Sequence, residues 1–587
     1  MEQQLGNVEI YPPSPSPRPS ATRSSRSRML FDVHWIIILV QFIVILALCL
    51  GLFAFFLTRS ESPPAYSTRT YQNFELQTIS PNSSPLTFRR HFKTTDSPQD
   101  VDFDFSEDVE PTEEQQAVIT TSTTITQIKQ SKLLESGSVH SAEVFEKFEH
   151  EENLRAAVFT VSQTCSEIGK SILVRGGNAV DAAIAASFCL MGAVPNKASL
   201  AGGMMMTVRS TGGNVTTIMA LESAPMNTNI EQLQKNPELT RRGPKASGTP
   251  GVLNGLFRAF QKYTSNRIQW KHLLLPTTQQ CVRGFEISDE LRSVSKTPAL
   301  ASFFKANQQG DKLFCNGLAT TLTEISEYEN PLDIFYHGEM AQKLVKELNG
   351  YLSVSDLEDY ESDVSTAICV EIDTDTKLCG PEPPSLFAVL SNTYFVTKNM
   401  SNLDKVNEMI RSSSSLAAKI ADPMFVKTSK KHAEELAKTS KRNNVEMKET
   451  AVSFKEDGST EVLVIDENNM TASVTLSLGD DFGNLIYSTS GFFWNNKLRY
   501  FDLKNENFPL SLQPGKVPTT LASPIIITKN NSVHAVSGGT DMLALVHLLR
   551  HITHRNYDAS KVAPSLFLQN SAISLKSPSN RYSITGY

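Results

Sequence analysis

Residues 165–196 read CSEIGKSILVRGGNAVDAAIAASFCLMGAVPN, a stretch that predicts two consecutive helices. Apolar residues at helical spacing predict a first helix over Thr164–Arg175, and Gly176-Gly177 is a typical stop signal at a helix C-terminus. Asn178 then caps a second helix, with Asp181 three residues further on in the position of a capping box. The second helix consists of small and apolar side chains, which predicts that it is buried.

Two pairs of strands are predicted around a mainly helical middle part. Met204–Arg209 and Val215–Leu221 are joined by the sequence STGGN, which suits a hairpin turn. A helix is predicted to open at Ser355, with carboxylates in its first turn where the helix dipole favours them. Glu461–Asp466 and Thr471–Leu478 indicate two more strands, and in the second of these apolar side chains alternate with Ser and Thr. Helices flanking such strands predict an α/β domain built in layers.

Residues 35–57 carry the strongest compositional signal. They read WIIILVQFIVILALCLGLFAFFL, 23 residues without a formal charge, and a helix of this length spans the roughly 30 Å hydrocarbon core of a bilayer. Four arginines precede the segment and only Arg59 follows closely, so the positive-inside rule places residues 1–34 in the cytoplasm and the rest outside. We therefore expect a single-pass type II protein of the plasma membrane. A cleaved signal peptide is the alternative, although its apolar region is usually shorter and nearer the N-terminus.

The other N-terminal segments lack the apolar periodicity of a folded domain. Residues 1–34 are rich in Ser, Pro and Arg, and residues 58–155 contain Ser/Thr clusters and the acidic run DVDFDFSEDVEPTEE at 100–114. Both are predicted to be disordered, the first as a cytoplasmic tail and the second as an extracellular stalk. Globular character begins near Ala156. The net charge of −7 gives no support to nucleic-acid binding.

Two weaker features are compatible with a location outside the cell. Six of the seven cysteines follow the apolar segment, and an even number in an oxidising compartment permits three disulfides. Sequons for N-glycosylation begin at Asn82, Asn214, Asn399, Asn469 and Asn530.

The stretch quoted first resembles the opening of the large subunit of γ-glutamyltransferases (glutathione hydrolases), in which GGNAVDAA is a specific string. Further matches follow in the family's order over roughly 156–560, and their shared order carries more weight than any single motif. They are AGG at 201–203, SAP at 223–225, TPG at 249–251, GxxxxxDLxxY ending at Tyr360, PPS at 383–385, DPxFV at 422–426, FG at 482–483, SGxxxNN at 490–496, PGKxP at 514–518 and GG at 538–539.

The resemblance implies an αββα N-terminal-nucleophile hydrolase fold. Family members cut themselves before a threonine, which then attacks the γ-glutamyl amide of glutathione and related compounds and passes the acyl group to water or to an acceptor amine. This division predicts a large-subunit-like region at 156–458 and a small-subunit-like region at 459–587. Only 48 residues follow Gly539, fewer than family members usually carry, so closing strands of the small subunit are expected to be missing.

The family cleaves within GTxHxSVV, just before a strand, and the corresponding stretch here is GSTEVLVID at 458–466. Counting back from the strand puts Ser459 in the nucleophile position, or Thr460 if the register differs by one. A serine hydroxyl can attack the preceding carbonyl, and the freed α-amine can then act as the base. The alternative is a Gly-Ser turn leading into a strand, without self-cleavage. Gly538-Gly539 match the pair whose backbone N–H groups stabilise the oxyanion in the family.

The substrate-binding positions depart from the family's pattern. The arginine that clamps the α-carboxylate is replaced by an apolar residue, and basic or aromatic residues stand where acids and amides hold the α-amino group. Losing two or three charged hydrogen bonds, each worth roughly 1.5–3 kcal/mol, would lower affinity by about three to six orders of magnitude. The positions are Leu221 for the arginine, Gly479 for the asparagine ahead of FG, Lys497, Arg499 and Tyr500 in the acidic segment, and Thr519 and Thr520 for the serine pair after PGKxP.

Two functions from different classes remain open. The first is a surface enzyme acting on glutathione or related amides, with weak or altered activity, in which Arg499 or Lys497 clamps a carboxylate from a new side and Asp480 or Asp481 takes the amine. The second is an inactive family member that serves as an interaction or regulatory ectodomain. Association with active relatives is a further partner hypothesis.

Neither a cofactor nor a metal ion is expected. HLLRHITH at 547–554 places three histidines on one helical face, but no carboxylate or cysteine joins them. The resemblance also implies a Cys165–Cys189 disulfide. Cys369 and Cys379 flank a predicted hairpin, which leaves Cys281 with Cys315 as a hypothesis for the third pair.

Overall fold

The computed structural model describes residues 155–439, 456–506 and 508–553, together with the strand segments 567–570, 573–575 and 583–586. The predicted tail, the predicted membrane span at 35–57, the stalk up to residue 154 and the sequon at Asn82 lie outside the described residues. Within the described ranges, no helix is long and apolar enough to cross a membrane.

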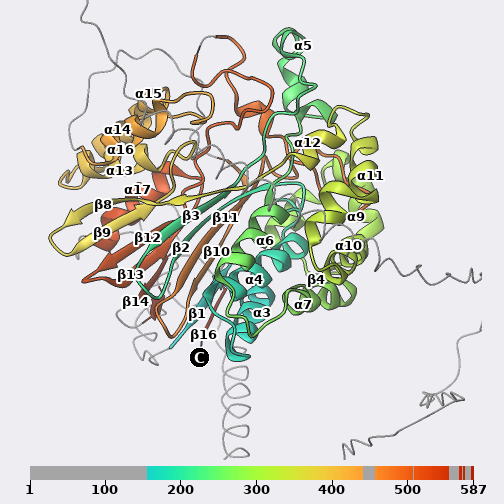
Figure 1. The fold of residues 1–587 in the computed structure, drawn as a ribbon, viewed down its shortest axis with the longest axis horizontal. Helices are drawn as coiled ribbons and strands as arrows, with labels where there is room; N and C mark the ends of the chain where they lie inside the picture. Colours follow the sequence, from blue (N-terminus) through green and yellow to red (C-terminus); the bar gives the residue numbers. More distant parts are fainter. Residues whose placement is uncertain are drawn as a thin grey trace, which may run out of the picture. The chain divides into compact units, whose positions relative to one another are not determined.

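Two antiparallel sheets form the centre of the fold (Figure 1). Among the described residues the strand order is β16-β1-β10-β11-β2-β3-β7 in the first sheet and β15-β14-β13-β12-β9-β8 in the second. Between the sheets lies an apolar layer in which Phe159 and Leu463 pack with Ile526 and Val536. The first sheet comprises β1 (Ala157–Thr160), β2 (Gly203–Arg209), β3 (Val215–Ala220), β7 (Asp363–Thr366), β10 (Gly458–Ile465), β11 (Thr471–Gly479) and β16 (Ser583–Gly586). The second comprises β8 (Ile368–Asp373), β9 (Thr376–Gly380), β12 (Ile525–Lys529), β13 (Ser532–Ser537), β14 (Phe567–Asn570) and β15 (Ile573–Leu575).

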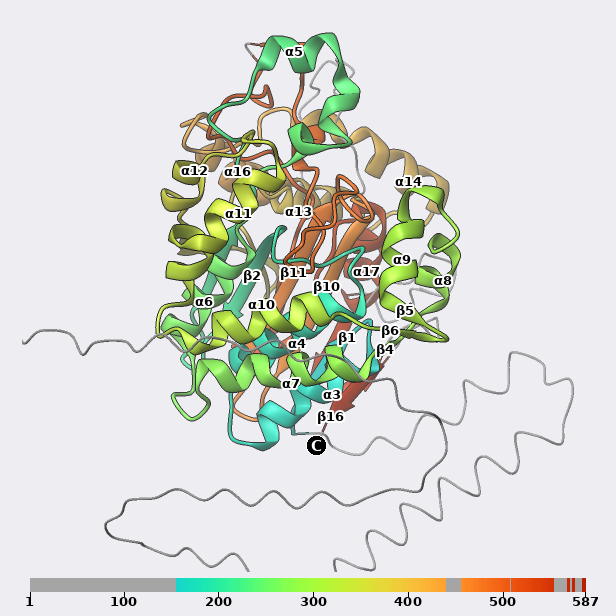
Figure 2. The same ribbon diagram turned by 90° about the vertical axis from the view of Figure 1, so that its right-hand side faces the viewer.

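Helices cover the outer face of each sheet, which completes the predicted αββα order of layers. Figure 2 shows α4, α7 and α10 in front of the first sheet. The helices on this side are α3 (Gln163–Val174), α4 (Ala179–Ala193), α6 (Val252–Tyr263), α7 (Trp270–Arg283), α10 (Asn316–Glu327), α11 (Glu339–Glu347) and α12 (Val354–Glu358). The second sheet is covered by α13 (Phe387–Thr397), α14 (Leu403–Ser412), α15 (Ser414–Ala417), α16 (Ser429–Ala437) and α17 (Met542–Thr553).

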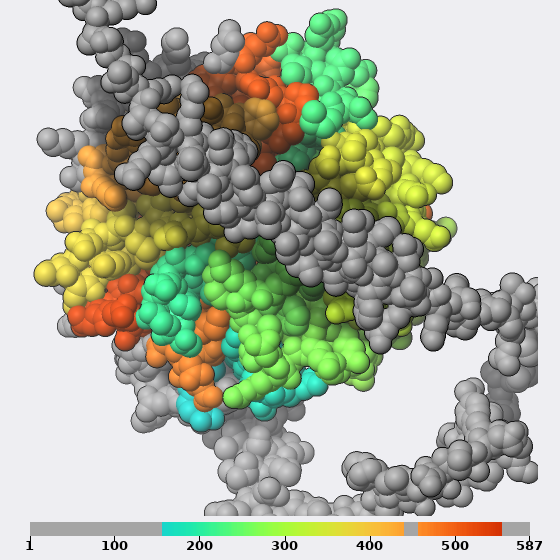
Figure 3. All heavy atoms as spheres, viewed as in Figure 1, coloured from blue at the N-terminus to red at the C-terminus, as the bar shows by residue number. Residues whose placement is uncertain are grey.

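Smaller elements complete the described structure. α5 (Ile230–Lys235) projects at the top of both ribbon views and stands out in the space-filling view (Figure 3). A short sheet, β4-β6-β5, accompanies two further helices. These elements are β4 (Phe285–Glu286), β5 (Gln308–Gln309), β6 (Lys312–Leu313), α8 (Asp289–Val294) and α9 (Ala301–Asn307).

The opening helices follow the signals read from the sequence. α3 ends just before Gly176, which has a φ of +89°, a conformation that glycine adopts without strain. Asn178 caps α4: its side chain accepts from the backbone of Val180 and Asp181, and the Asp181 carboxylate accepts from the backbone of Asn178. Every residue of α4 is buried, because its small side chains let it pack between α3, α7 and the first sheet.

Two expectations are corrected. The helix predicted to open at Ser355 begins at Val354, because Ser353 forms the capping box with Asp356. The closing strands are present: β14 and β15 extend the second sheet, and β16 pairs antiparallel with β1. β16 pairs with a strand far away in the sequence, whereas β14 pairs with the neighbouring β15 and with β13. All three lie in a stretch whose own pattern does not predict them.

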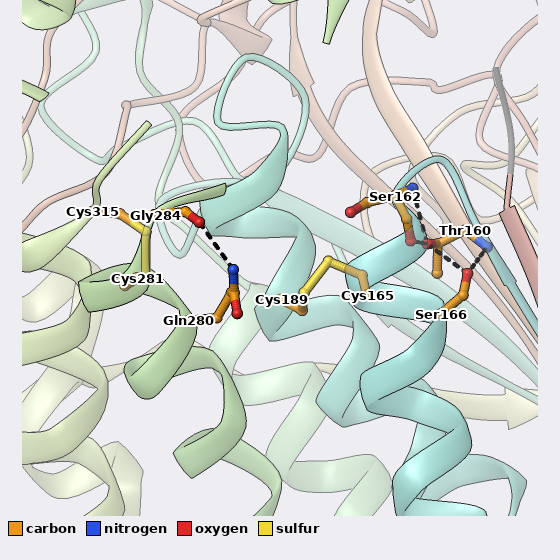
Figure 4. The surroundings of a disulfide bond; sticks show 9 residues. All are labelled: Thr160, Ser162, Cys165, Ser166, Cys189, Gln280, Cys281, Gly284 and Cys315. Atoms are coloured by element: carbon orange, nitrogen blue, oxygen red, sulfur yellow. Dashed lines mark hydrogen bonds between the residues drawn. A yellow bond between two sulfur atoms is a disulfide. The ribbon is translucent and has the colours of Figure 1, made fainter. Parts of the chain in front are cut away.

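The three disulfides join the pairs named from the sequence. Cys165–Cys189 links α3 to α4, and Cys281–Cys315 links the end of α7 to the residue that caps α10 (Figure 4). Cys369–Cys379 joins directly opposite residues of the hairpin β8–β9.

Arg209 ties together three hairpin tips at one end of the sheets. Its guanidinium donates to the backbone carbonyls of Asn469, in the β10–β11 turn, and of Asn531, in the β12–β13 turn, at 3.0 and 2.5 Å. Arg209 itself ends β2, where the β2–β3 turn begins. Three of the predicted sequons, at Asn214, Asn469 and Asn530, lie in these three turns.

Candidate active site

Ser459 is the second residue of β10, at the end of the strand opposite to Asn469. Its Oγ lies 2.5 Å from Thr540 Oγ1 and 3.2 Å from the carbonyl oxygen of Glu456. The Thr540 hydroxyl donates to the same carbonyl at 2.9 Å. If Thr540 uses its proton in that bond, it accepts the proton of Ser459, and a continuous chain runs from Ser459 through Thr540 to Glu456.

Thr460, the other candidate nucleophile, lies in a different environment. Successive side chains of a strand point to opposite faces, so Thr460 points away from the side on which Ser459 meets Thr540. Its hydroxyl oxygen is buried and has no hydrogen-bond partner among the described residues. The local geometry therefore favours Ser459.

The glycine pair Gly538-Gly539 follows β13 and precedes Thr540, so it lies beside β10. A Cβ atom on Gly538 would lie 3.4 Å from Glu461 Cγ, and one on Gly539 would lie 3.7 Å from Glu461 Oε1. Glu461 is two residues after Ser459 and therefore shares its face of β10. Burial raises the pKa of Glu461 to about 7, although the charge of Lys197 acts in the opposite direction. The glycine pair that is predicted to supply the oxyanion donors therefore lies beside the face of β10 that carries Ser459.

Glu456, three residues before Ser459, is a central part of the site that the sequence analysis did not single out. Its side chain is 1% exposed, and Lys497 donates to its carboxylate. Ser477 Oγ and Thr520 Oγ1 donate to it at 3.0 and 2.6 Å, and the backbone N–H of Leu521 does so at 3.2 Å. Burial alone would raise the pKa of Glu456, but Lys497 and these hydroxyls outweigh burial and lower it.

Lys497 is buried at the start of a short 3-10 helix, Lys497–Tyr500. Its ammonium lies 5.2 Å from the centre of the Tyr500 ring, so it contacts an aromatic face as well as Glu456. Burial lowers the pKa of Lys497, but the carboxylates of Glu456 and Glu222 raise it above its usual value. Lys497 is therefore a charged group held inside the site.

Glu222 is the third buried ionisable group of this cluster. Both of its carboxylate oxygens are buried, and no side chain among the described residues donates a hydrogen bond to them. Burial raises the pKa of Glu222 to about 7, while Lys497 acts to lower it. Gly203 makes room for this carboxylate, because a Cβ there would lie 2.1 Å from Glu222 Oε2.

Arg499 and the two aspartates proposed to take an amine are held in internal pairs. Arg499 pairs with Asp480, and Asp481 lies 3.4 Å from Lys197. Asp480 also accepts from Asn496 at 2.9 Å. Gly479 has a φ of +93°, and a Cβ there would lie 2.3 Å from Asn496 Oδ1, so this position has no room for a side chain.

Only some of the remaining predicted substrate-binding positions lie beside the buried charges of Glu456, Lys497 and Glu222. Leu221 lies in an apolar group with Met205 and Ala522. Of the two threonines, only Thr520 reaches Glu456, because Thr519 donates to the carbonyl of Ile420 at 2.7 Å. The structure thus brings together Lys497, Tyr500 and Thr520 but not Leu221 or Thr519.

The remaining sites considered in the sequence are the glycosylation sequons and the histidine-rich helix. Asn214, Asn399 and Asn530 are exposed and Asn469 is half-buried. His547 makes a hydrogen bond of 2.8 Å with Asn407. Among the described residues, no group of three His, Cys, Asp or Glu side chains is arranged to hold a metal ion.

Comparison with known proteins defines the class and then the family. The chain shares its fold with cephalosporin acylase from Bacillus halodurans, with a TM-score of 0.57 and 18% identity over 71% of this chain and 83% of that one. The chain therefore has the α/β fold of that acylase. The sequence model described as gamma-glutamyltranspeptidase matches residues 165–546, and the chain belongs to this family.

The relatives of known name agree with this assignment. Glutathione hydrolase 3 from Arabidopsis thaliana is 27% identical over 430 residues, which cover 65% of this chain and 67% of that protein. Glutathione hydrolase proenzyme 1 from Schizosaccharomyces pombe is 29% identical over 445 residues, which cover 66% of this chain and 69% of that protein.

Proposed function

We propose that this chain is a self-processing amidase of the glutathione hydrolase type, with Ser459 as its N-terminal nucleophile. The observation that carries the proposal is the hydroxyl chain at the start of β10, in which Ser459 Oγ lies 2.5 Å from Thr540 Oγ1. This contact orients a nucleophile beside the Gly458–Ser459 peptide bond.

In the proposed maturation, Ser459 Oγ attacks the carbonyl carbon of Gly458 and the peptide nitrogen of Ser459 leaves with the proton. Water then hydrolyses the resulting ester, which leaves a carboxylate on Gly458 and a free α-amine on Ser459. In turnover that α-amine takes the Oγ proton as the hydroxyl attacks the substrate amide, and it donates the proton to the leaving amine. The backbone N–H groups of Gly538-Gly539 are proposed to stabilise the oxyanion in turnover.

The substrate class is a γ-glutamyl or related amide, and we propose that ordinary glutathione turnover is weak. Leu221 offers no charge to the α-carboxylate, and the buried cation of Lys497 stands where family members bind an α-ammonium group. A positive charge close to a bound ammonium group is repulsive, and the low dielectric constant of a buried site strengthens the repulsion.

The test of self-cleavage is a reducing gel of the full chain beside its Ser459→Ala variant. Cleavage before Ser459 gives a fragment of residues 459–587, less than a quarter of the 64.8 kDa chain, which the variant should lack. A single uncut band from folded wild-type protein would refute the proposed nucleophile. Release of glutamate from glutathione, compared with a buffer control, then measures turnover.

The buried pair of Glu456 and Lys497 favours a second candidate function. Glu456 and Lys497 satisfy each other in the uncut chain, and Leu221 lies among apolar side chains. An inactive ectodomain that binds a partner, including an active relative, would need no open site. Folded, uncut wild-type protein that co-purifies with an active family member would support this candidate.

We further propose that the globular part lies outside the plasma membrane, anchored by residues 35–57. The charge asymmetry around that segment and the exposed sequons at Asn214, Asn399 and Asn530 support this orientation. A decrease in mass after treatment with a glycosidase, lost in Asn→Gln variants at these positions, is the expected result. Unglycosylated full chain from a secretory host would argue against this orientation.

A further inference from the structure

The three disulfides of the described structure differ in how exposed their cysteines are. In the bridge between β8 and β9, Cys369 is exposed and Cys379 is 2% exposed. The four cysteines of the other two bridges are at most 6% exposed: Cys165, Cys189, Cys281 and Cys315. Of these three bridges, Cys369–Cys379 alone presents a cysteine to a dissolved molecule while the fold stays closed.

The position of this bridge in the sheet explains the difference between its two ends. β8 is the last strand of the second sheet among the described residues, so it has a neighbouring strand on one side only (Figure 1). Ile368 and Val370 pack into the apolar core shared with α13, and Cys369 lies between them on the opposite face of the strand. Cys379 is on β9, which has β8 on one side and β12 on the other. A small molecule therefore meets Cys369 before Cys379.

Access of this kind decides which sulfur of a disulfide reacts. Thiol–disulfide exchange begins when a thiolate attacks one of the two sulfur atoms, and its rate depends on which sulfur the thiolate can reach. In this bridge the attacked atom is Cys369 Sγ and the leaving atom is Cys379 Sγ. The buried cysteines of the other two bridges offer no such starting point.

We infer that Cys369 is a site of reversible modification by low-molecular-weight thiols and that Cys379 is its resolving cysteine. The incoming thiolate forms a bond to Cys369 Sγ, the bond between the two cysteines breaks, and its electron pair leaves on Cys379 Sγ, which takes a proton from water. The products are a mixed disulfide on Cys369 and a free thiol on Cys379. The inference does not depend on the proposed nucleophile.

The backbone of the hairpin makes this modification reversible. On either side of the bridge the strands remain paired, Ile368 with Gly380 and Val370 with Leu378. Opening the bridge therefore leaves the Cys379 thiol directly opposite the mixed disulfide, at a high effective concentration. When the free thiol is removed, Cys379 attacks the mixed disulfide, releases the small thiol and closes the bridge again.

The short loop of this bridge also favours its opening. The cysteines are 10 residues apart in the sequence, against 24 and 34 residues in the other two bridges. In the chain-entropy model a disulfide stabilises a fold less when it closes a shorter loop. Because the hairpin is also held by its backbone pairs, we expect the folded chain to tolerate the open bridge.

The charges beside the bridge do not select one kind of thiol. Glu371, two residues after Cys369, lies opposite Lys377 across the hairpin, and both are exposed. Opposite charges in such a cross-strand pair largely offset each other in water. We therefore expect glutathione, which is anionic, and cysteamine, which is cationic, to react at rates within tenfold of each other.

The first test uses the wild-type full chain, produced in a secretory host so that the bridges form. Glutathione is added in native buffer, and samples are quenched with acid at intervals. Free thiols are then blocked with N-ethylmaleimide, and the peptides are mapped by mass spectrometry. Cysteamine is used in a parallel series.

The expected result is glutathione on Cys369 and N-ethylmaleimide on Cys379, appearing at least tenfold faster than either other bridge opens. The adduct should disappear and the bridge should return when glutathione is removed. Glutathione on Cys379 instead, another bridge opening at the same rate, or no opening in native buffer would each overturn the inference. An adduct that persists without free thiol would show that Cys379 is not a resolving cysteine.

Two matched variants compare the cysteines one at a time. Cys379→Ser leaves Cys369 as a free thiol, and Cys369→Ser leaves Cys379. With glutathione disulfide as the probe, Cys369 should be modified at least tenfold faster than Cys379, and its adduct should persist because no resolving thiol remains. Equal rates would contradict the assignment of Cys369 as the attacked cysteine. The wild-type peptide map decides the inference if either variant fails to fold.

Discussion

At the scale of single residues, Thr540 is the partner that distinguishes Ser459 from its neighbour. We expect Thr540→Val, which keeps the shape but removes the hydroxyl, to slow self-cleavage by at least about tenfold, because Ser459 loses the shorter of its two hydrogen bonds and keeps only the 3.2 Å bond to the carbonyl of Glu456. The rate is measured from the appearance of the 459–587 fragment after synthesis is stopped.

Thr460→Val is the matched control for this prediction. The Thr460 hydroxyl is buried without a partner among the described residues, so its removal should leave cleavage unchanged. Loss of cleavage in Thr460→Val with normal cleavage in Thr540→Val would show that the register is wrong and that Thr460 is the nucleophile.

Gly479 shows why the family's residue cannot simply be restored. We expect Gly479→Asn to lower the free energy of unfolding by roughly 2–4 kcal/mol. The backbone at residue 479 has a positive φ, and the new side chain would clash with that of Asn496. Gly350→Ala is the control: it has a φ of +70° but nothing within 4 Å of a new Cβ, so only about 1 kcal/mol should be lost. Equal losses in urea unfolding would show that the close approach of Asn496 is unimportant.

At this scale the sequence predicted part of the candidate site. Ser459, Lys497 and Thr520 were found because they occupy positions of a linear motif. Glu456 and Thr540 were not singled out, because their roles depend on contacts across 64 and 81 residues, Glu456 with Thr520 and Thr540 with Ser459. No local pattern marks a glutamate whose partners come from three separate segments.

At the scale of elements, the capping residue pair of α4 also joins this helix to the end of α6. The Asp181 carboxylate accepts from the backbone of Asn178 and Ser265 and from the hydroxyl of Thr264, at 3.1, 3.0 and 2.9 Å. We expect Asp181→Ala to cost roughly 2–4 kcal/mol, because buried donors lose their acceptor.

Asn229→Ala tests whether this cost exceeds that of an ordinary cap. Asn229 caps the short exposed helix α5 and accepts from Gln232 alone, so its loss should cost about 1 kcal/mol or less. Urea unfolding of both variants in a Ser459→Ala background measures the difference. A smaller effect at Asp181 than at Asn229 would contradict the proposed link between α4 and α6.

Elements with strong local signals were predicted well. α3, α4 and the hairpin β2–β3 carry caps, glycines and alternation within the sequence that forms them. β16 carries no such signal and pairs with β1, more than 400 residues earlier. Its stability depends on a partner that only the folded chain brings near.

At the scale of the whole molecule, Glu222 and Glu461 make stability depend on pH. Burial raises the pKa of both carboxyls from 4.5 to about 7. Between these values the folded chain holds protons that the unfolded chain has released, so the free energy of unfolding falls as pH rises from 4.5 to 7, by roughly 3 kcal/mol per group. Glu456, whose pKa is lowered, acts in the other direction and loses its stabilising effect below pH 4.5.

Glu222→Gln in the Ser459→Ala background should flatten this slope. Its urea midpoint should change less between pH 5 and 7 than that of the parent, because one of the two raised carboxyls is gone. Glu408→Gln, at an exposed position of α14, should keep the parent slope. An unchanged slope in Glu222→Gln would mean that this carboxyl titrates normally in the folded chain.

The hydrogen bonds of Arg209 affect which molecules can approach each end of the two sheets. They gather the turns that carry Asn214, Asn469 and Asn530 at the end of β10 away from Ser459. Oligosaccharides attached there would form a hydrated layer over that end of the two sheets and would leave the end that carries Ser459 uncovered. This layer would shield the turns from proteases and keep neighbouring molecules away from them. Substrate would still be able to enter at the end that carries Ser459.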